Sequence, residues 1–158
     1  MSVGNNSTYG ELLTTSVDEM LKNITPLKEE SVFLDIGSGK GHIVSRMADV
    51  PSVSRAIGVE LIKNRHKRAL EIYGGKDKVE LYCGDILKMD KYIKEADIVF
   101  MNSLTWPTKV MDDIYPRIKS GAYIIHNNAW FSGKERFKLV QLATSWYKRS
   151  TWYISKKK

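Results

Sequence analysis

The sequence lacks the features of disulfide-stabilised, membrane-spanning and secreted proteins. Its one cysteine, Cys83, excludes an internal disulfide, and the apolar residues around it predict a small buried side chain rather than a nucleophile. No apolar run approaches the roughly 18 residues of a membrane span. The first residues also lack the basic start and apolar core of a signal peptide. We therefore expect a cytoplasmic protein that makes no membrane contact.

Residue patterns that bind metals are also missing. No cluster of cysteine and histidine has the spacing of a zinc site, and the neighbouring acids Asp112 and Asp113 would point apart on a helix. His42, His66 and His126 have no carboxylate at a spacing that suggests a general base. We expect no bound metal, and we expect the histidines to be structural.

What remains is the composition of one globular domain with a basic surface. The chain has 158 residues, of which 42% are hydrophobic, and no linker divides it, so we expect a single monomeric domain over residues 1–158. The formal net charge of +7 attracts acidic partners such as nucleic acid, or merely keeps the protein soluble. The basic residues at 63–68 suit a weak nucleic-acid contact, whereas the lysine tail at 156–158 is expected to be a solvated end.

Apolar patterns of strand and helix type alternate along the chain. Short β-rich runs predict strands at 31–36, 54–60, 79–83, 97–101 and 122–125. Helical spacing predicts helices at 14–24, 62–73 and 134–142, and another that contains Ile43, Val44 and Met47. Residues 145–148 and 151–155 predict a closing antiparallel hairpin. Because parallel neighbours need crossover connections, this alternation favours an α/β fold with helices on both faces of the sheet. We predict a Rossmann-like, doubly wound sheet of seven strands that ends in the hairpin.

A glycine-rich turn follows the first predicted strand. It reads Asp-Ile-Gly-Ser-Gly-Lys-Gly from Asp35 and places Gly37, Gly39 and Gly41 at alternate positions. Glycines let the backbone turn sharply and approach a ligand closely, and the following helix start offers unpaired N–H groups to a carboxylate or phosphate. Such a turn alone supports nucleotide binding only weakly.

Glu60 strengthens that interpretation. It ends the second predicted strand about 20 residues after the turn, where a carboxylate can bind ribose hydroxyls. NAD, FAD and S-adenosylmethionine all satisfy this requirement. The spacing G-x-G-x-G after an acid differs from the dinucleotide pattern G-x-G-x-x-G, which favours S-adenosylmethionine, with S-adenosylhomocysteine as product. Asp35 would then bind the cofactor's ammonium group, and a solvated acid at a strand end is the alternative.

Two further strand ends carry candidate site residues. Asp85 and Ile86 follow the third predicted strand and would bond the adenine amine and flank its ring, or simply form a turn. Asn102 follows the fourth strand and would orient the acceptor amine or only shape its loop. Trp106, with Trp130 and Tyr153, suits an apolar channel for that amine, although ordinary packing accounts equally well for these aromatics.

Together these motifs resemble the non-SET protein-lysine methyltransferases of the disruptor-of-telomeric-silencing type, and above all their small archaeal members. The shared signatures are Tyr9-Gly10-Glu11, the glycine turn, Gly58-Val59-Glu60, Gly84-Asp85-Ile86 and the Asn102 loop, which span residues 9 to about 130. The resemblance implies a class I S-adenosylmethionine-dependent methyltransferase fold. It also implies that residues 1–30 supply a loop over the cofactor and a first helix.

The resemblance further implies roles for individual residues. Those around the cofactor would be Tyr9, Glu11, Asp35, Gly37, Glu60, Asp85 and Asn102, and the candidate catalytic residues would be Asn102, Tyr9 and Trp106. Without it, Tyr9 would be interpreted as packing against the first helix. The substrates would be lysine ε-amines of lysine-rich, chromatin-associated proteins, including small DNA-binding proteins, methylated with broad specificity. Eukaryotic members have a large N-terminal helical region and an Asn where this chain has Ser103, so nucleosome-specific recognition is less well supported.

Two other functions fit part of the pattern. A DNA, rRNA or tRNA N-methyltransferase would suit the basic charge and Asn102. Such enzymes of this fold resemble one another in an Asn-Pro-Pro-Tyr or Asp-Pro-Pro-Tyr loop, however, and only the Asn is present here. A cofactor-binding or DNA-binding protein without turnover would suit the basic helix and predicts salt-sensitive DNA binding.

Overall fold

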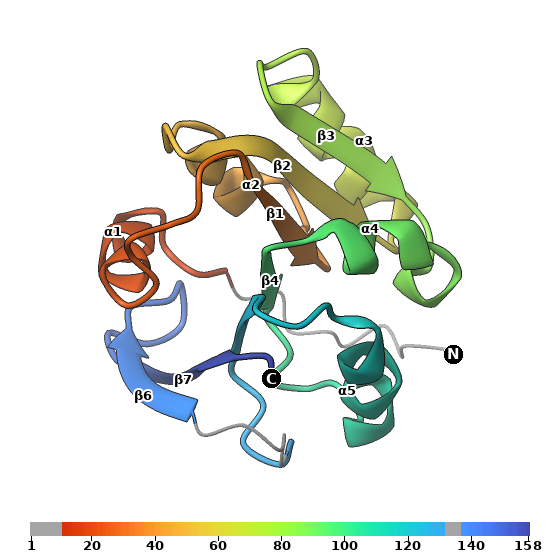
Figure 1. Ribbon diagram of the computed structural model, residues 1–158. Coiled ribbons are helices and arrows are strands. Elements are labelled where there is room, and N and C mark those ends of the chain that lie inside the picture. Colours follow the sequence, from red (N-terminus) through yellow and green to blue (C-terminus); the bar gives the residue numbers. More distant parts are fainter. Residues whose placement is uncertain (1–10, 132–136) are drawn as a thin grey trace.

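The protein is built on one seven-stranded sheet, seen in the computed structural model of residues 11–131 and 137–158 (Figure 1). The strand order is β3-β2-β1-β4-β5-β7-β6, and β1 to β5 are parallel while β7 and β6 are antiparallel. The strands are β1 Ser31–Ile36, β2 Val53–Glu60, β3 Val79–Cys83, β4 Ile98–Met101, β5 Tyr123–His126, β6 Phe137–Leu142 and β7 Ser150–Lys156. The predicted doubly wound sheet with a closing hairpin is confirmed.

Helices cover both faces of this sheet. They are α1 Thr15–Lys22, α2 His42–Ala48, α3 Lys63–Tyr73, α4 Asp90–Glu95 and α5 Thr108–Ile114, with 3₁₀ turns η1 Ile86–Lys88 and η2 Tyr115–Arg117. Successive strand residues point to opposite faces, so Phe33 packs with Met20 of α1 in one buried cluster while Leu34 packs with Met111 of α5 in the other. Burial on both faces explains the nearly continuous apolar strands.

The chain reverses direction across the sheet between β3 and β4. It runs outward from β1 through β2 to β3 and then returns to β4 on the other side of β1. At this switch point β1 and β4 end side by side, with Ile36 opposite Met101. Ligands of open α/β sheets bind beyond the carboxyl ends of the strands at this kind of position.

The predicted helix at 134–142 is wrong where the structure describes it. Residues 137–142 form β6, which pairs with β7 from Phe137 opposite Ser155 to Leu142 opposite Ser150. Val140 and Leu142 are buried and their neighbours are exposed, which is the two-residue period of a strand. Residues 145–148 therefore lie in the turn of the hairpin rather than in one of its strands. The long-range pairing with β7 outweighed a local spacing that also suited a helix.

The expectation of a buried Cys83 is also wrong, because its side chain is exposed. It ends β3, which is an edge strand with partly exposed residues along its length. The faces of the sheet are only partly covered at this edge, and Cys83 lies at the end of the strand. The short helix α4 and the turn η1 were not predicted. Among the described residues, no helix is both long and apolar enough to cross a membrane.

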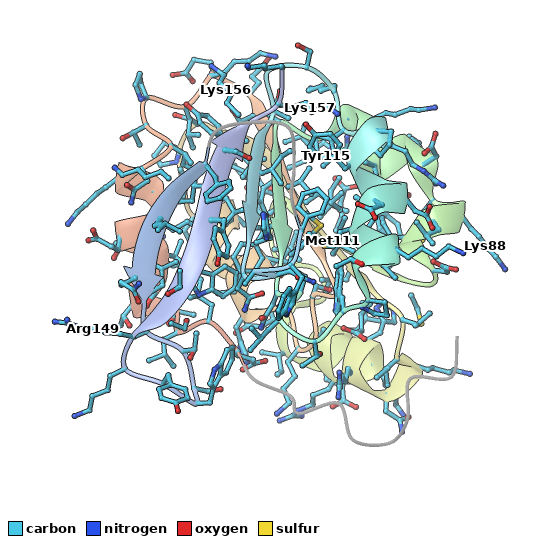
Figure 2. The ribbon with its side chains drawn as sticks, turned by 90° about the horizontal axis from the view of Figure 1, so that it is seen from below. Lys88, Met111, Tyr115, Arg149, Lys156 and Lys157 are labelled. Carbon is cyan, nitrogen blue, oxygen red and sulfur yellow. The ribbon has the colours of Figure 1, made fainter. Side chains whose placement is uncertain are left out.

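The lysine tail is more closely packed than a solvated end. Lys157 donates from its backbone to Ala122 O at 2.8 Å, and its Nζ donates to Tyr115 O at 2.9 Å. The same ammonium lies 3.7 Å from the centre of the Tyr115 ring (Figure 2). β7 extends to Lys156, so this part of the tail belongs to the sheet and to its contact with η2.

Gly58 of β2 provides a test of how closely the glycine turn packs on the sheet. A Cβ atom there would lie 2.7 Å from Ser38 Oγ and 2.9 Å from Val44 Cγ2. We expect Gly58→Ala to lower the free energy of unfolding by about 1–3 kcal/mol through overpacking, measured by urea denaturation. The backbone of Gly58 is not among the positive-φ positions, so the expected loss comes from the contacts of the added Cβ alone. A Gly58→Ala protein as stable as the wild type would contradict the close packing.

Candidate active site

The glycine turn has the backbone conformation that its sequence suggests. Gly37, Gly39 and Gly41 have φ angles of 81°, 55° and 83°, in the left-handed region where a side chain would be strained. Gly37 N donates to Val59 O at 2.8 Å, which ties the turn to β2. Gly41 precedes α2, and a Cβ there would lie 3.4 Å from the ring of Tyr73. Gly41 therefore serves helix packing, whereas Gly37 and Gly39 face the ligand side.

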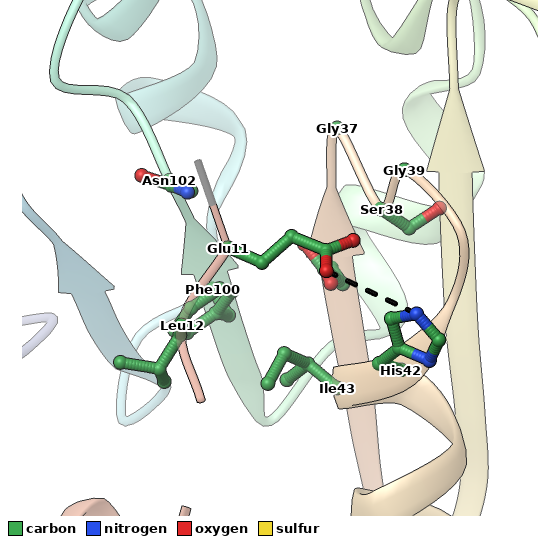
Figure 3. Close-up of a pocket in the computed structure, with 10 residues that line it drawn as sticks. Glu11, Leu12, Gly37, Ser38, Gly39, His42, Ile43, Phe100 and Asn102 are labelled. Carbon is green, nitrogen blue, oxygen red and sulfur yellow. Dashed lines mark ion pairs between the residues drawn. The ribbon is translucent and has the colours of Figure 1, made fainter. Parts of the chain in front are cut away.

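A hollow lies beside this turn at the carboxyl ends of β1 and β4 (Figure 3). It has about 40 Å³ of open volume, and its lining residues are Glu11, Leu12, Asp35, Gly37, Ser38, Gly39, His42, Ile43, Phe100 and Asn102. Small-molecule pockets usually measure roughly 300–1,000 Å³. The hollow would therefore hold only one end of a nucleoside-sized ligand.

Asp35 is the buried charge of this hollow. It is the last residue but one of β1, with 3% of its surface exposed, and its Oδ1 has no hydrogen-bond partner among the described residues. Burial, followed by the nearby Glu60 and Glu11 carboxylates, holds the pKa of Asp35 well above its usual range. A buried carboxyl without a donor is costly and is common at functional sites. A ligand cation at this position would supply the missing partner.

Glu60 is also buried, with 4% of its surface exposed, but both of its oxygens are paired. Oε2 accepts from Gly39 N at 2.7 Å and Oε1 accepts from Ile62 N at 2.9 Å. The carboxylate thus links the glycine turn to the start of α3. Within the part of the chain that the structure describes, these two carboxylates have opposite surroundings, because backbone N–H groups bind both oxygens of Glu60 while Oδ1 of Asp35 has no partner.

Asp85 and Ile86 lie after β3, as predicted. Asp85 Oδ1 accepts from Leu87 N at 2.9 Å and so caps η1, and Ile86 is buried. Neither residue lines the hollow beside the glycine turn. Of the predicted site residues, the structure brings Glu11, Asp35, Gly37, Gly39 and Asn102 together there. Glu60 ends β2, the neighbour of β1, and Asp85 follows β3, the next strand outward. Tyr9 lies outside the described residues.

Asn102 is held by a residue that the sequence analysis missed. Asn127 Nδ2 donates to Asn102 Oδ1 at 2.8 Å, while Asn127 Oδ1 accepts from Ser103 N at 2.7 Å. Asn128 Nδ2 donates to Ser103 O at 3.1 Å and to Trp106 O at 3.0 Å. The loops after β4 and β5 are therefore fastened together. A signal was present in the sequence, since two consecutive asparagines follow the last parallel strand.

The three aromatic residues predicted to form an acceptor channel make separate contacts. Trp106 lies beside Gly37, where an added Cβ would be 3.2 Å from its ring. Trp130 is 85% exposed, and Tyr153 stacks on His126 with ring centres 5.1 Å apart. Burial lowers the pKa of His126 to about 4, so this histidine is neutral at pH 7 and fits the structural role predicted for it. Trp106 is the aromatic placed next to the glycine turn.

His42 was expected to be structural, but it lines the hollow. Its Nδ1 is 2.5 Å from Tyr73 Oη, and its Nε2 is 3.9 Å from Glu11 Oε2, the ion pair drawn in Figure 3. Glu11 is 31 residues earlier in the chain, so no sequence spacing could indicate this pair. Among the described residues, no group of three or more His, Cys, Asp or Glu side chains could hold a metal ion.

The sequence of this chain is similar to those of known methylation proteins. The sequence model for Histone methylation protein DOT1 matches residues 2–141. A histone H3 lysine-79 methyltransferase of Cryptococcus neoformans is 29% identical over 77% of this chain and 21% of its own length. The corresponding protein of Gibberella zeae is 27% identical over 83% of this chain and 30% of its own length. The chain thus spans less than a third of the length of these relatives.

Solved structures show the same fold. An RNA methyltransferase of Salinibacter ruber in complex with S-adenosylhomocysteine aligns with a TM-score of 0.67 and 26% identity, over 89% of this chain and 88% of that protein. A methyltransferase-like protein of Methanococcus maripaludis aligns with a TM-score of 0.68 and 15% identity, over 89% and 83% of the two chains. The second likeness concerns the fold alone. The first covers nearly the whole of both proteins.

Proposed function

The chain belongs to the DOT1 family of histone methylation proteins, and from this we propose that it is an S-adenosylmethionine-dependent protein-lysine N-methyltransferase. The observation that carries the proposal is the buried Asp35 carboxyl, which lines a hollow shared with Glu11 and whose Oδ1 has no partner among the described residues. S-adenosylmethionine has an ammonium group and a sulfonium centre. An acidic, partly buried hollow at the switch point of the sheet favours a ligand with these positive charges.

The residues around the hollow fit the parts of this cofactor. Asp35 and Glu11 would bind its ammonium, and Glu60 would accept bonds from the ribose hydroxyls. Asp85 would accept a bond from the adenine amine, with Ile86 against the ring. The left-handed turn at Gly37 and Gly39 lets the backbone approach the ligand closely. When bound, S-adenosylmethionine supplies a methyl group that is open to direct displacement by an amine.

The loops after β4 and β5 would position the acceptor. Asn102 lines the hollow, and its Oδ1 already accepts from Asn127, so the orientation of its amide is set. Trp106 beside Gly37 would give the lysine stem an apolar surface. An apolar approach also favours the neutral amine over the ammonium, and only the neutral amine can attack the methyl group. No covalent intermediate with the protein is needed.

The acceptors we propose are lysine-rich, chromatin-associated proteins, methylated with broad specificity. The relatives described as acting on histone H3 lysine 79 support a chromatin substrate. A net charge of +7 repels a free lysine-rich acceptor, but it would bring the enzyme to one that is bound to DNA. The exposed residues Lys63, Lys67 and Arg68 of α3 are candidates for that contact.

The direct test is incubation with S-adenosylmethionine and a small lysine-rich DNA-binding protein, with product sites located by mass spectrometry. We expect methylation on lysine that rises severalfold between pH 7 and pH 9, because a free lysine has a pKa of about 10.4. Asn102→Ala should lower kcat about 100-fold by releasing the acceptor from its orientation. The exposed change Asp77→Asn is the control. Bound cofactor without methylated lysine would contradict the proposal.

A second candidate is RNA methylation. It is favoured by the basic charge of this chain and by its 26% identity to the Salinibacter ruber RNA methyltransferase over 88% of that protein. An RNA mixture in the same assay separates the two functions. Methyl groups found on RNA and not on lysine would replace the lysine proposal with this one.

A further inference from the structure

The turn between β6 and β7 is paired with the segment that closes the hollow. Glu11 N donates to Ser145 Oγ at 3.0 Å, and Ser145 N donates to Glu11 O at 2.8 Å. Next to this pair, Leu12 and Thr144 form an antiparallel bridge, and Leu13 N donates to Ala143 O at 3.2 Å. The two segments therefore lie together as a short two-stranded ladder, although Glu11 and Ser145 are 134 residues apart in the sequence.

Both the main chain and the side chain of Glu11 are held by contacts. Ser145 binds its main chain on both sides, through the N–H and the C=O groups. Its side chain extends into the hollow, where its carboxylate is paired with His42 and contributes to the raised pKa of Asp35 (Figure 3). Because the side chain starts from a main chain that Ser145 fixes, the distance from the Glu11 carboxylate to Asp35 depends on that contact.

We propose that Ser145 is a positioning residue for cofactor binding, acting through Glu11. This inference rests on the proposed function, since it concerns the affinity of the same site for S-adenosylmethionine. Ser145 is exposed, and it does not line the hollow. Its hydroxyl holds the Glu11 main chain in the conformation from which the carboxylate meets the cofactor's ammonium. The Glu11 segment is then already ordered before the cofactor binds, which lowers the entropy cost of binding.

The pairing also explains why the hairpin matters to a site on the other half of the sheet. β6 and β7 follow β5 in the sheet order, while Asp35 and the glycine turn belong to β1 and α2. The ladder at Glu11 and Ser145 joins the hairpin turn to the segment that lines the hollow. A change in the hairpin turn should therefore alter cofactor affinity without touching a residue that contacts the cofactor.

The test compares Ser145→Ala with Ser145→Thr in the full chain. We expect Ser145→Ala to raise both the Kd for S-adenosylmethionine, measured by calorimetry, and its KM about five- to tenfold, the usual effect of one lost hydrogen bond. At saturating cofactor, kcat should stay within about twofold of the wild type, because the acceptor loops are unchanged. Ser145→Thr keeps an acceptor oxygen at the same place and should restore the wild-type Kd.

Ser150→Ala is the matched control in the same hairpin. Ser150 Oγ donates to Leu142 O at 3.0 Å and accepts from Trp152 Nε1 at 2.8 Å, so its bonds stay within the hairpin. We expect this change to lower the melting temperature more than Ser145→Ala does, because Ser145 is exposed. It should nevertheless leave the Kd for S-adenosylmethionine at the wild-type value. An equal loss of affinity in both variants would mean a structural effect and would overturn the proposal.

A double-mutant cycle with Glu11→Ala decides whether Ser145 acts through Glu11. If it does, Ser145→Ala should change the Kd less than twofold once the Glu11 carboxylate is gone. The same five- to tenfold effect in the Glu11→Ala background would overturn the proposal, as would unchanged binding by Ser145→Ala alone. A wild-type chain that binds no S-adenosylmethionine would instead contradict the proposed function, so the two failures are distinguishable.

Discussion

Asp35→Asn should stabilise the protein and abolish tight cofactor binding. Asp35 is buried, and its Oδ1 has no hydrogen-bond partner among the described residues. An amide of the same shape removes the desolvation cost of the buried carboxylate and its repulsion from Glu60 and Glu11. It also adds an NH₂ group that can donate hydrogen bonds to those two carboxylates. We expect about 1–3 kcal/mol of added stability at pH 7, or roughly 2–10 °C in Tm by calorimetry. The Kd for S-adenosylmethionine should rise at least about tenfold, because a charge-assisted bond to the ammonium is lost.

The stabilisation by Asp35→Asn should depend on pH in a defined direction. The raised pKa means that the folded protein keeps the Asp35 proton at pH values where the unfolded chain, with an Asp pKa of about 3.9, has lost it. Wild-type stability therefore falls as pH rises through the folded pKa, and below about pH 4 this group makes no difference. The gap in Tm between variant and wild type should widen from pH 4 upwards. A gap that is constant with pH, or that narrows, would contradict the raised pKa.

Glu60→Gln should lose cofactor binding as well, but with the opposite effect on stability. Each oxygen of Glu60 accepts a backbone N–H, from Gly39 and from Ile62, so a Gln side chain leaves at least one of these buried donors facing an NH₂ group. We expect a loss of about 1.5–3 kcal/mol in the free energy of unfolding, measured by urea denaturation. The Kd for S-adenosylmethionine should rise at least about tenfold with the loss of a ribose acceptor.

The two variants control each other, because both change a buried carboxyl to an amide at neighbouring strand ends. Asp77→Asn adds an exposed site, where neither stability nor cofactor affinity should change. If Asp35→Asn and Glu60→Gln shifted Tm in the same direction, hydrogen-bond supply would not be the reason for the difference between the two carboxylates. That outcome would remove the main argument for a cation at Asp35.

Much of the fold could be predicted because its signals are local. The five parallel strands are short apolar runs ended by turn residues. The glycines of the turn indicate its left-handed backbone conformation, because other residues rarely adopt it. The last part of the chain was harder, since Val140 and Leu142 suit a helix or a strand and only pairing with β7 decides between them. Edge position in the sheet, which exposes Cys83, is likewise absent from any local pattern.

The candidate site divides in the same way. Asp35, Glu60, Asp85 and Asn102 could be named from the sequence, because each lies at or just after the end of a predicted strand and parallel strands end at one edge of the sheet. His42 and Ser145 could not, since each acts through a residue far away in the chain, and the two asparagines after β5 gave a signal for Asn127 but not for its partner Asn102. Their residue types have no distinctive spacing, and only the folded chain brings them to their partners.

The sequence by itself therefore determined the architecture, the family and the strand ends at which a ligand would bind. Those features follow from the periodicity of apolar residues and from residues with special backbone preferences, such as glycine. The tertiary structure decided which carboxylate is paired and which is not, and what holds Glu11 over the hollow. Burial and hydrogen-bond supply depend on the packing of distant segments, so two acids near the ends of neighbouring apolar strands, Asp35 and Glu60, acquire opposite electrostatic surroundings.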